Sequence, residues 1–116
     1  MSFSYQIKKE NNLLIIALQG NLIGKEQVGE LFNEIDFELN QGAENIIIDL
    51  NEMLYLNSTG LSIFIQILTK VRNNGGDVVV INVPEKINKL LVITKLNSVF
   101  NIKDSVEKAK LELIKN

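Results

Sequence analysis

The chain has 116 residues, 46% of them hydrophobic and 22% charged, and this composition suits one globular domain, which we expect to span residues 1–116. Its formal net charge of −2 disfavours nucleic acid as the main partner, because phosphate binding needs a basic surface. The absence of cysteine and histidine excludes disulfides, thiolate nucleophiles, and the commonest general base and metal ligand.

The first half of the chain predicts three strands and a helix. Residues 5–9 alternate apolar and polar side chains, and the apolar run 13–18 follows a turn, which together indicate a hairpin. We expect residues 20–24 to form a loop. An apolar stripe over residues 25–39 predicts a helix. The run of isoleucines at 46–48 favours a central parallel strand that is buried on both faces.

The second half predicts further alternation of helices and strands. Residues 61–71 have helical apolar spacing, and residues 77–82 read as another buried strand. Pro84 opens the next helix, since proline is favoured in a first helical turn. Residues 96–102 are ambiguous and include a candidate short edge strand. Asp104 is the predicted N-cap of a final helix.

This order of elements predicts an α/β fold. We expect a single domain with a mixed, mostly parallel sheet of four to five strands and about four helices, in which the first hairpin adds an antiparallel edge. Ser58 would follow the carboxyl end of a central strand. Ligands of open α/β sheets bind at such ends.

A hydroxyl-rich turn at residues 56–61 is the candidate site. Ser58 or Thr59 would lie at a helix N-terminus, where a side-chain oxygen can cap a free backbone N–H. The same position suits an anion, so a phosphate on Ser58 could be held without unfolding the domain. Ile63 and Ile67 widen the apolar surface of the following helix, and either core packing or a contact surface next to Ser58 would explain them.

Several segments of the chain form a recognisable set of motifs. Asp49 and Leu50, followed by Leu-Tyr-Leu-Asn-Ser-Thr-Gly-Leu at 54–61, resemble the signature of the STAS domain family of bacterial anti-sigma factor antagonists. Residues 18–22 resemble its early strand with a glycine and an acidic residue, residues 74–80 its Gly-Gly turn, and residues 87–100 the stretch around its third helix. Nearly the whole chain is covered in order and at compatible spacing.

The resemblance implies a phosphorylation switch. Signalling members of the family bind an anti-sigma factor that is also a serine kinase, which frees the sigma factor. The kinase inactivates them by phosphorylating the serine that Ser58 matches, with Thr59 as a second candidate acceptor, and a serine phosphatase reverses the step. The implied partner-binding residues are Asn21, Asn57, Ser58, Thr59, Gly60, Ile63 and Ile67. Asn57 and Asn21 stand where the family usually has acidic residues.

Two other functions stay open. One is a STAS scaffold subunit of a lipid-transport ATPase or a signalling assembly, in which Ser58 is a contact or a cap. The other is an enzyme that uses Asp49, Glu52 and Ser58, or a Ser-Lys pair. We do not expect an enzyme, because the chain has neither a phosphate-binding Gly-x-x-x-x-Gly-Lys loop nor a Gly-x-Ser-x-Gly elbow. The sequence therefore predicts no catalytic residue, metal site or cofactor.

The sequence also favours a cytoplasmic protein. No apolar run approaches the roughly 20 residues of a membrane-spanning helix, so we expect no direct membrane insertion. The first residues lack the basic and apolar blocks of a signal peptide.

Overall fold

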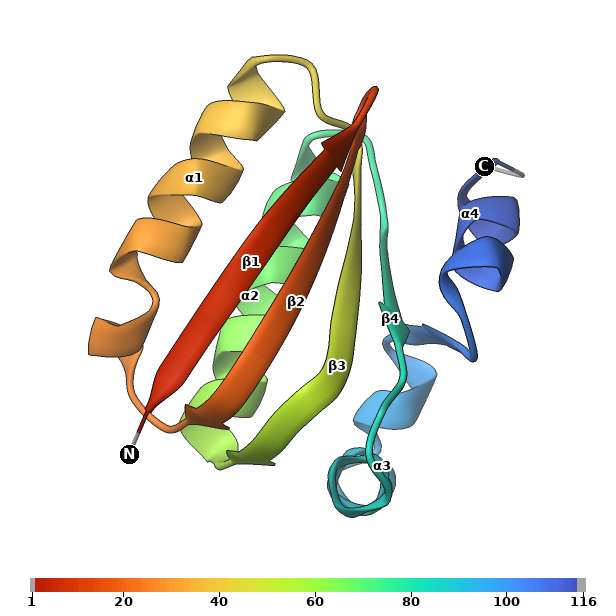
Figure 1. The fold of residues 1–116 in the computed structure, drawn as a ribbon. Coiled ribbons are helices and arrows are strands. Elements are labelled where there is room, and N and C mark those ends of the chain that lie inside the picture. Colours follow the sequence, from red (N-terminus) through yellow and green to blue (C-terminus); the bar gives the residue numbers. More distant parts are fainter. Residues whose placement is uncertain (1, 115–116) are drawn as a thin grey trace.

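The computed structural model describes residues 2–114 (Figure 1). The elements follow in the order β1 (Phe3–Glu10), β2 (Leu13–Leu22), α1 (Gly29–Asn40), β3 (Asn45–Leu56), α2 (Ser58–Asn73), β4 (Val78–Ile81), α3 (Glu85–Ile93), β5 (Asn101–Lys103) and α4 (Val106–Ile114). Two short 3-10 helices, Lys25–Gln27 and Leu96–Ser98, precede α1 and β5.

The strands form one five-stranded sheet in the order β1-β2-β3-β4-β5. β1 is antiparallel to β2, and the other neighbouring pairs are parallel. The predicted mixed, mostly parallel sheet is therefore confirmed, as is its antiparallel edge. β3 lies in the middle of the sheet, so the segment that follows it starts from the centre of the fold.

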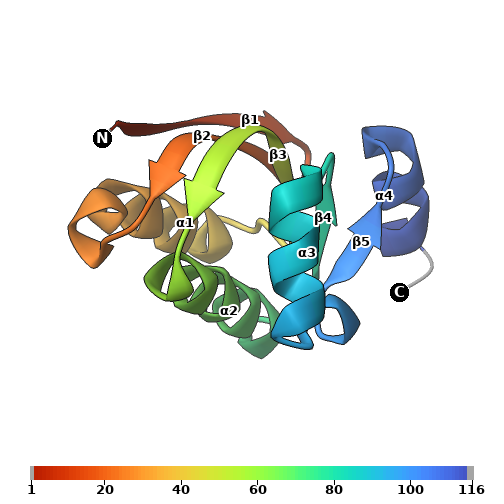
Figure 2. The ribbon, with the colours of Figure 1, turned by 90° about the horizontal axis from the view of Figure 1, so that it is seen from below.

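Helices cover the two faces of the sheet unequally. α1 and α2 lie beneath one face, while α4 lies at the other (Figures 1 and 2). Ile46 and Ile48 point into the large core with α1 and α2, whereas Ile47 packs with Ala109 and Leu113 of α4. Alternate side chains of a strand point to opposite faces, so the isoleucine run is buried on both sides, as predicted. Full burial of each such side chain contributes about 1.5–3 kcal/mol.

Two predictions in the first half of the chain are wrong in detail. β2 continues to Leu22, although residues 20–24 read as a loop, because register shifts on either side of Gly20 let Asn21 and Leu22 pair with the end of β3. Gly20 accommodates this with φ of +91°, a conformation that favours glycine. The predicted helix at 25–39 is split into a 3-10 turn and α1.

Two predictions near the C-terminal end also need correction. The edge strand is confined to Asn101–Lys103, because Phe100 turns into the core and stacks edge-on against Phe64. α4 is capped by Ser105, whose Oγ accepts a hydrogen bond from the Lys108 backbone N–H at 3.2 Å. Asp104 forms an ion pair with Lys108 instead of the predicted cap.

Candidate functional site

The cap of α2 is Asn57. Its backbone is extended, and its Oδ1 accepts a hydrogen bond from the backbone N–H of Gly60 at 3.0 Å. The prediction that Ser58 or Thr59 caps this helix is therefore wrong. Ser58 is the first residue of α2 and is exposed, and within residues 2–114 its hydroxyl makes no hydrogen bond. Thr59 is half-buried.

Asn57 also joins the end of β3 to the end of β2. Its Nδ2 donates to the carbonyl oxygen of Ile23 at 3.2 Å, and its backbone N–H donates to Leu22 at 3.4 Å. Asn21 of β2 lies opposite Tyr55 of β3, next to the last pair of these two strands, Leu22 and Leu56. The structure thus brings Asn21 and Asn57, two of the implied partner-binding residues, to the same end of the sheet as Ser58.

Gly60 has a packing role in this turn. It is buried, and a Cβ atom added there would lie 2.7 Å from the carbonyl oxygen of Leu22 and 2.8 Å from Cβ of Leu56. Only glycine lets the first turn of α2 approach β2 and β3 this closely. Gly60 therefore shapes the site from beneath and presents no side chain to a partner.

Ile63 and Ile67 are core residues. Each is 1% exposed, so the interpretation that they form a contact surface next to Ser58 is wrong. Figure 2 shows the reason: α2 lies under the sheet, with α1 on one side and α3 on the other. A helix with neighbours on three sides needs an apolar surface wider than one stripe.

The exposed apolar surface lies elsewhere, in a groove beside Ser58. This groove has a volume of about 470 Å³ and lies between the end of β3 and α3. Its lining is Leu54, Tyr55, Leu56, Asn57, Ser58, Leu61, Lys86, Ile87, Leu90 and Thr94. We call it the Ser58 groove. Leu54 is 71% exposed and Tyr55 is 51% exposed, so the groove presents adjoining apolar side chains next to Ser58, and contiguous exposed apolar surface is a feature of binding sites.

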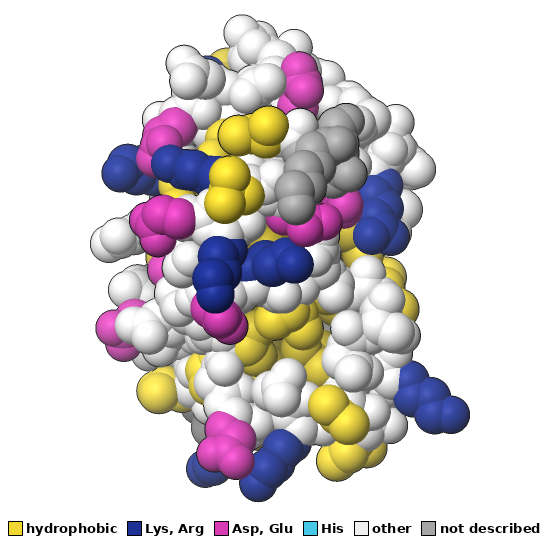
Figure 3. Space-filling view, turned by 90° about the vertical axis from the view of Figure 1, so that its right-hand side faces the viewer, with side chains coloured by type: hydrophobic (Ala, Val, Ile, Leu, Met, Phe, Trp, Pro, Cys, Tyr) yellow, Lys and Arg dark blue, Asp and Glu magenta, His cyan; other side chains and the backbone are white. Residues whose placement is uncertain are grey.

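Figure 3 views the molecule from the side of α3 and α4, and hydrophobic side chains gather in its lower half, where α3 lies. α3 also exposes Val92 and Ile93, which do not line the Ser58 groove. Sequence reasoning missed the contribution of α3 to the site. The groove is lined from this side by Lys86, Ile87, Leu90 and Thr94, and no local sequence pattern marks these residues as neighbours of Ser58.

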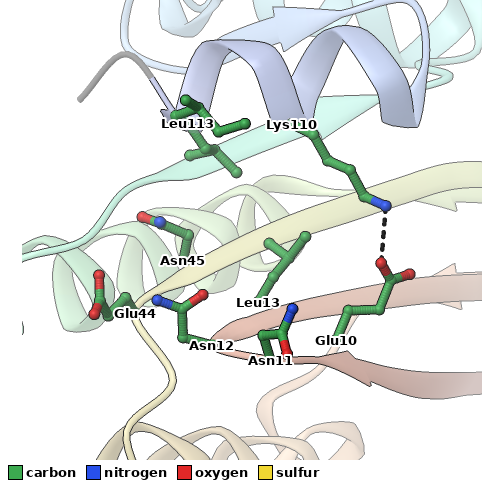
Figure 4. Close-up of a pocket in the computed structure, with 9 residues that line it drawn as sticks. Glu10, Asn11, Asn12, Leu13, Glu44, Asn45, Lys110 and Leu113 are labelled. Atoms are coloured by element: carbon green, nitrogen blue, oxygen red, sulfur yellow. Dashed lines mark hydrogen bonds and ion pairs between the residues drawn. The ribbon is translucent and has the colours of Figure 1, made fainter.

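A second hollow, of about 480 Å³, lies at the opposite end of the sheet (Figure 4). Lys110 of α4 pairs with Glu10 across it at 2.8 Å. This hydrogen bond lowers the pKa of Glu10. The hollow contains none of the predicted site residues, and its polar groups come mainly from the turn after β1 and from Glu44 and Asn45.

Asp49 and Ser58, which were considered for catalysis, do not come together; Lys86 lines the same groove as Ser58, but within residues 2–114 no hydrogen bond joins Ser58 to a lysine. Asp49 accepts hydrogen bonds from the Asn51 backbone and the Asn82 side chain, in the middle of β3. At about 3.3 Å per strand residue it lies roughly 20 Å from the strand end that leads to Ser58.

Within residues 2–114, no cluster of acidic side chains could hold a metal ion, and no helix is long and apolar enough to cross a membrane.

The chain belongs to the STAS domain family, whose family model matches residues 4–109. A curated relative, the putative anti-sigma factor antagonist BtrV of Bordetella bronchiseptica, is 24% identical over 101 residues, which cover 87% of this chain and 86% of the relative. The resemblance seen in the sequence motifs is thereby confirmed.

Solved structures share the fold. A putative anti-sigma factor antagonist from Thermotoga maritima superposes with a TM-score of 0.79 at 24% identity, covering 94% of this chain and 93% of that one. The phosphorylated form of the Bacillus cell fate determinant SpoIIAA superposes with a TM-score of 0.73 at 18% identity, covering 96% and 99%. At these identities the likeness is one of fold.

Proposed function

We propose that this chain is an anti-sigma factor antagonist. In this proposal the unphosphorylated chain binds an anti-sigma factor that is also a serine kinase, and so releases a sigma factor in the cytoplasm. Phosphorylation of Ser58 ends the binding, and a serine phosphatase restores it. The observation that carries the proposal is the exposed Ser58 hydroxyl, which no other described residue hydrogen-bonds, at the border of an apolar groove.

The local chemistry supports a switch of this kind. The N-terminal turn of α2 places free backbone N–H groups and the positive end of the helix dipole next to Ser58, so this domain tolerates an added phosphate. A phosphate adds about −1.5 to −2 charges at neutral pH. A partner packed on Leu54 and Tyr55 would have to desolvate that charge, which is costly without a matching cation. Exclusion of the partner then needs no change of fold.

Asn57 is compatible with this function, although relatives usually have an acidic residue there. An asparagine caps α2 and also donates to Ile23, and a carboxylate can do only the first. Asn57 therefore has a structural role within the domain.

A pull-down from the native cytosol, followed by binding of purified variants to any anti-sigma kinase that it recovers, tests the proposal. We expect wild type and Ser58→Ala to bind, and Ser58→Asp to lose binding. Asn73→Asp is the matched control, because it adds the same charge at the far end of α2. Incubation with the kinase and ATP should phosphorylate Ser58, identified by mass spectrometry, with Thr59 as the second site to inspect. Equal binding by all four proteins would overturn the switch and favour a scaffold subunit.

A further inference from the structure

β1 leaves one edge of the sheet open. It is the outermost strand, it has eight residues, and its register with β2 is continuous over all of them. Among residues 2–114, no strand pairs with its outer side. The other edge strand, β5, has only three residues. The Ser58 groove lies at the end of β3 and does not include this edge.

The ladder with β2 identifies the backbone groups that point outward. The Asn21 N–H donates to the Ser2 carbonyl oxygen at 2.9 Å, so Ser2 faces β2. In an antiparallel pair, alternate residues exchange hydrogen bonds with the partner strand. Hence the even-numbered residues of β1 bond to β2. Phe3, Tyr5 and Ile7 direct their N–H and C=O groups away from the sheet.

This edge lacks the features that usually block strand addition. Natural sheets protect long edges with charged side chains, proline or bulges. Residues 3–7 read Phe-Ser-Tyr-Gln-Ile, with no charge and no proline, and no bulge interrupts their pairing. The first lysines of the strand, Lys8 and Lys9, come at its far end. The open edge is therefore suited to another strand.

A groove lies beneath this edge, between β1 and the start of α1, and one of its two sides is acidic. It has a volume of about 890 Å³, and Phe3, Tyr5 and Ile7 line it from the strand side. Glu26 of the preceding 3-10 helix and Glu30 and Glu34 of α1 line the opposite side, and within residues 2–114 none of these three forms a salt bridge. Glu34 accepts a hydrogen bond from the Tyr5 hydroxyl. The groove is open, apolar on one side and negatively charged on the other.

The spacing of the acidic side chains suits an added strand. α1 runs alongside β1 in Figure 1. Glu30 and Glu34 are four residues apart, which is about 6 Å along a helix. Side chains on one face of a strand repeat every two residues, or about 6.6 Å. Alternate residues of a sixth strand would therefore meet successive carboxylates.

We propose that the outer edge of β1 binds an extended, basic segment of another protein as an additional strand. Its backbone pairs with Phe3, Tyr5 and Ile7, and its lysine or arginine side chains on the inner face reach Glu26, Glu30 and Glu34. A second copy of this chain is the poorer occupant. Pairing two β1 edges about a two-fold axis brings both acidic rows to one side of the joined sheet, where their like charges repel.

The probe for this site is a synthetic peptide, as long as β1, that alternates lysine with threonine. Its counterpart alternates glutamate with threonine. Titration followed by NMR should place the shift changes of the lysine peptide on β1 and the start of α1, and slow the hydrogen exchange of the outward Tyr5 and Ile7 amides roughly tenfold. The glutamate peptide should do neither.

Charge variants keep the test decisive. Glu26→Gln with Glu30→Gln should weaken binding of the lysine peptide roughly tenfold, because two of the three carboxylates are gone. Glu85→Gln with Glu107→Gln removes the same charge from α3 and α4 and should leave binding unchanged. Equal loss in both variants would mean nonspecific attraction and would overturn the proposal. So would self-association of the free chain that protects the Tyr5 and Ile7 amides, which would identify the edge as an interface between copies.

Discussion

The side chain of Asn57 caps α2 by accepting a hydrogen bond at Oδ1 from the backbone N–H of Gly60, at 3.0 Å, and this bond positions the candidate site. The same side chain donates from Nδ2 to Ile23. One amide group thus starts α2 and fixes it to the end of β2. The position of Ser58, the next residue, follows from these two bonds.

Two replacements of Asn57 should distinguish the contributions of its two hydrogen bonds to stability. Asn57→Ala loses both, so we expect a loss of about 1–2 kcal/mol in the free energy of unfolding. Asn57→Asp keeps an acceptor for Gly60 and adds a favourable charge at the helix N-terminus, but it cannot donate to Ile23. Urea denaturation should therefore place Asn57→Asp between wild type and Asn57→Ala. Equal stability of alanine and wild type would contradict the capping role.

Gly60 should not tolerate a side chain. The Cβ atom of Gly60→Ala meets Leu22 and Leu56 at less than 3 Å, which we expect to cost about 1–3 kcal/mol in stability. Gly29→Ala is the matched control, because a Cβ at the first residue of α1 meets nothing within 4 Å. There alanine should leave stability unchanged or raise it slightly, since it favours helix more than glycine does. Thermal unfolding of both variants checks the pair.

The sequence predicted where Ser58 lies in the fold, but it did not predict which residue caps α2. An isoleucine run followed by a helical pattern places Ser58 at the end of a central strand, and β3 and α2 confirm this. The prediction of Ser58 or Thr59 as the cap is wrong, because Asn57, the preceding residue, is an equally suitable cap. Only the extended backbone of Asn57 decides between them.

Other features depended on contacts that a single sequence does not reveal. Ile63 and Ile67 are buried because α2 has helices on both flanks, and no local pattern states which neighbours a helix has. The strand at Asn21 and Leu22 forms only because a glycine with positive φ lets the pairing resume after a register shift. The wall that α3 gives to the Ser58 groove likewise arises from tertiary packing.

Truncation of Ile63 should lower the stability of the domain, whereas truncation of Leu54 should weaken only the binding of a partner. Ile63→Ala removes buried atoms, and we expect a loss of about 2–5 kcal/mol in stability. Leu54→Ala removes an exposed side chain and should change stability by less than about 0.5 kcal/mol. If the Ser58 groove binds the anti-sigma factor, Leu54→Ala should still weaken that complex roughly tenfold, as an apolar anchor does. Calorimetric titration with the partner, alongside thermal melts, measures both effects. Unchanged affinity would place the partner elsewhere.

Tyr5 should titrate far above the usual range for tyrosine. Its hydroxyl donates to Glu34, and this bond, with partial burial and the charges of Glu34 and Glu30, raises the pKa of Tyr5 to about 12. The folded state holds the proton more tightly than the unfolded state. The stability gained from this bond is therefore complete below the ordinary tyrosine pKa of about 10, and is lost as the pH rises through about 12.

Near-ultraviolet absorbance of a Tyr55→Phe variant, which leaves Tyr5 as the only tyrosine, reports this titration directly. We expect a midpoint close to 12. Addition of Glu34→Ala should shift the midpoint down toward 10, because both the acceptor and its charge are removed. Glu44→Ala, which removes an exposed acid from the loop after α1, should leave the midpoint in place. A midpoint near 10 in the protein that retains Glu34, while circular dichroism still reports a folded chain, would contradict the bond between β1 and α1.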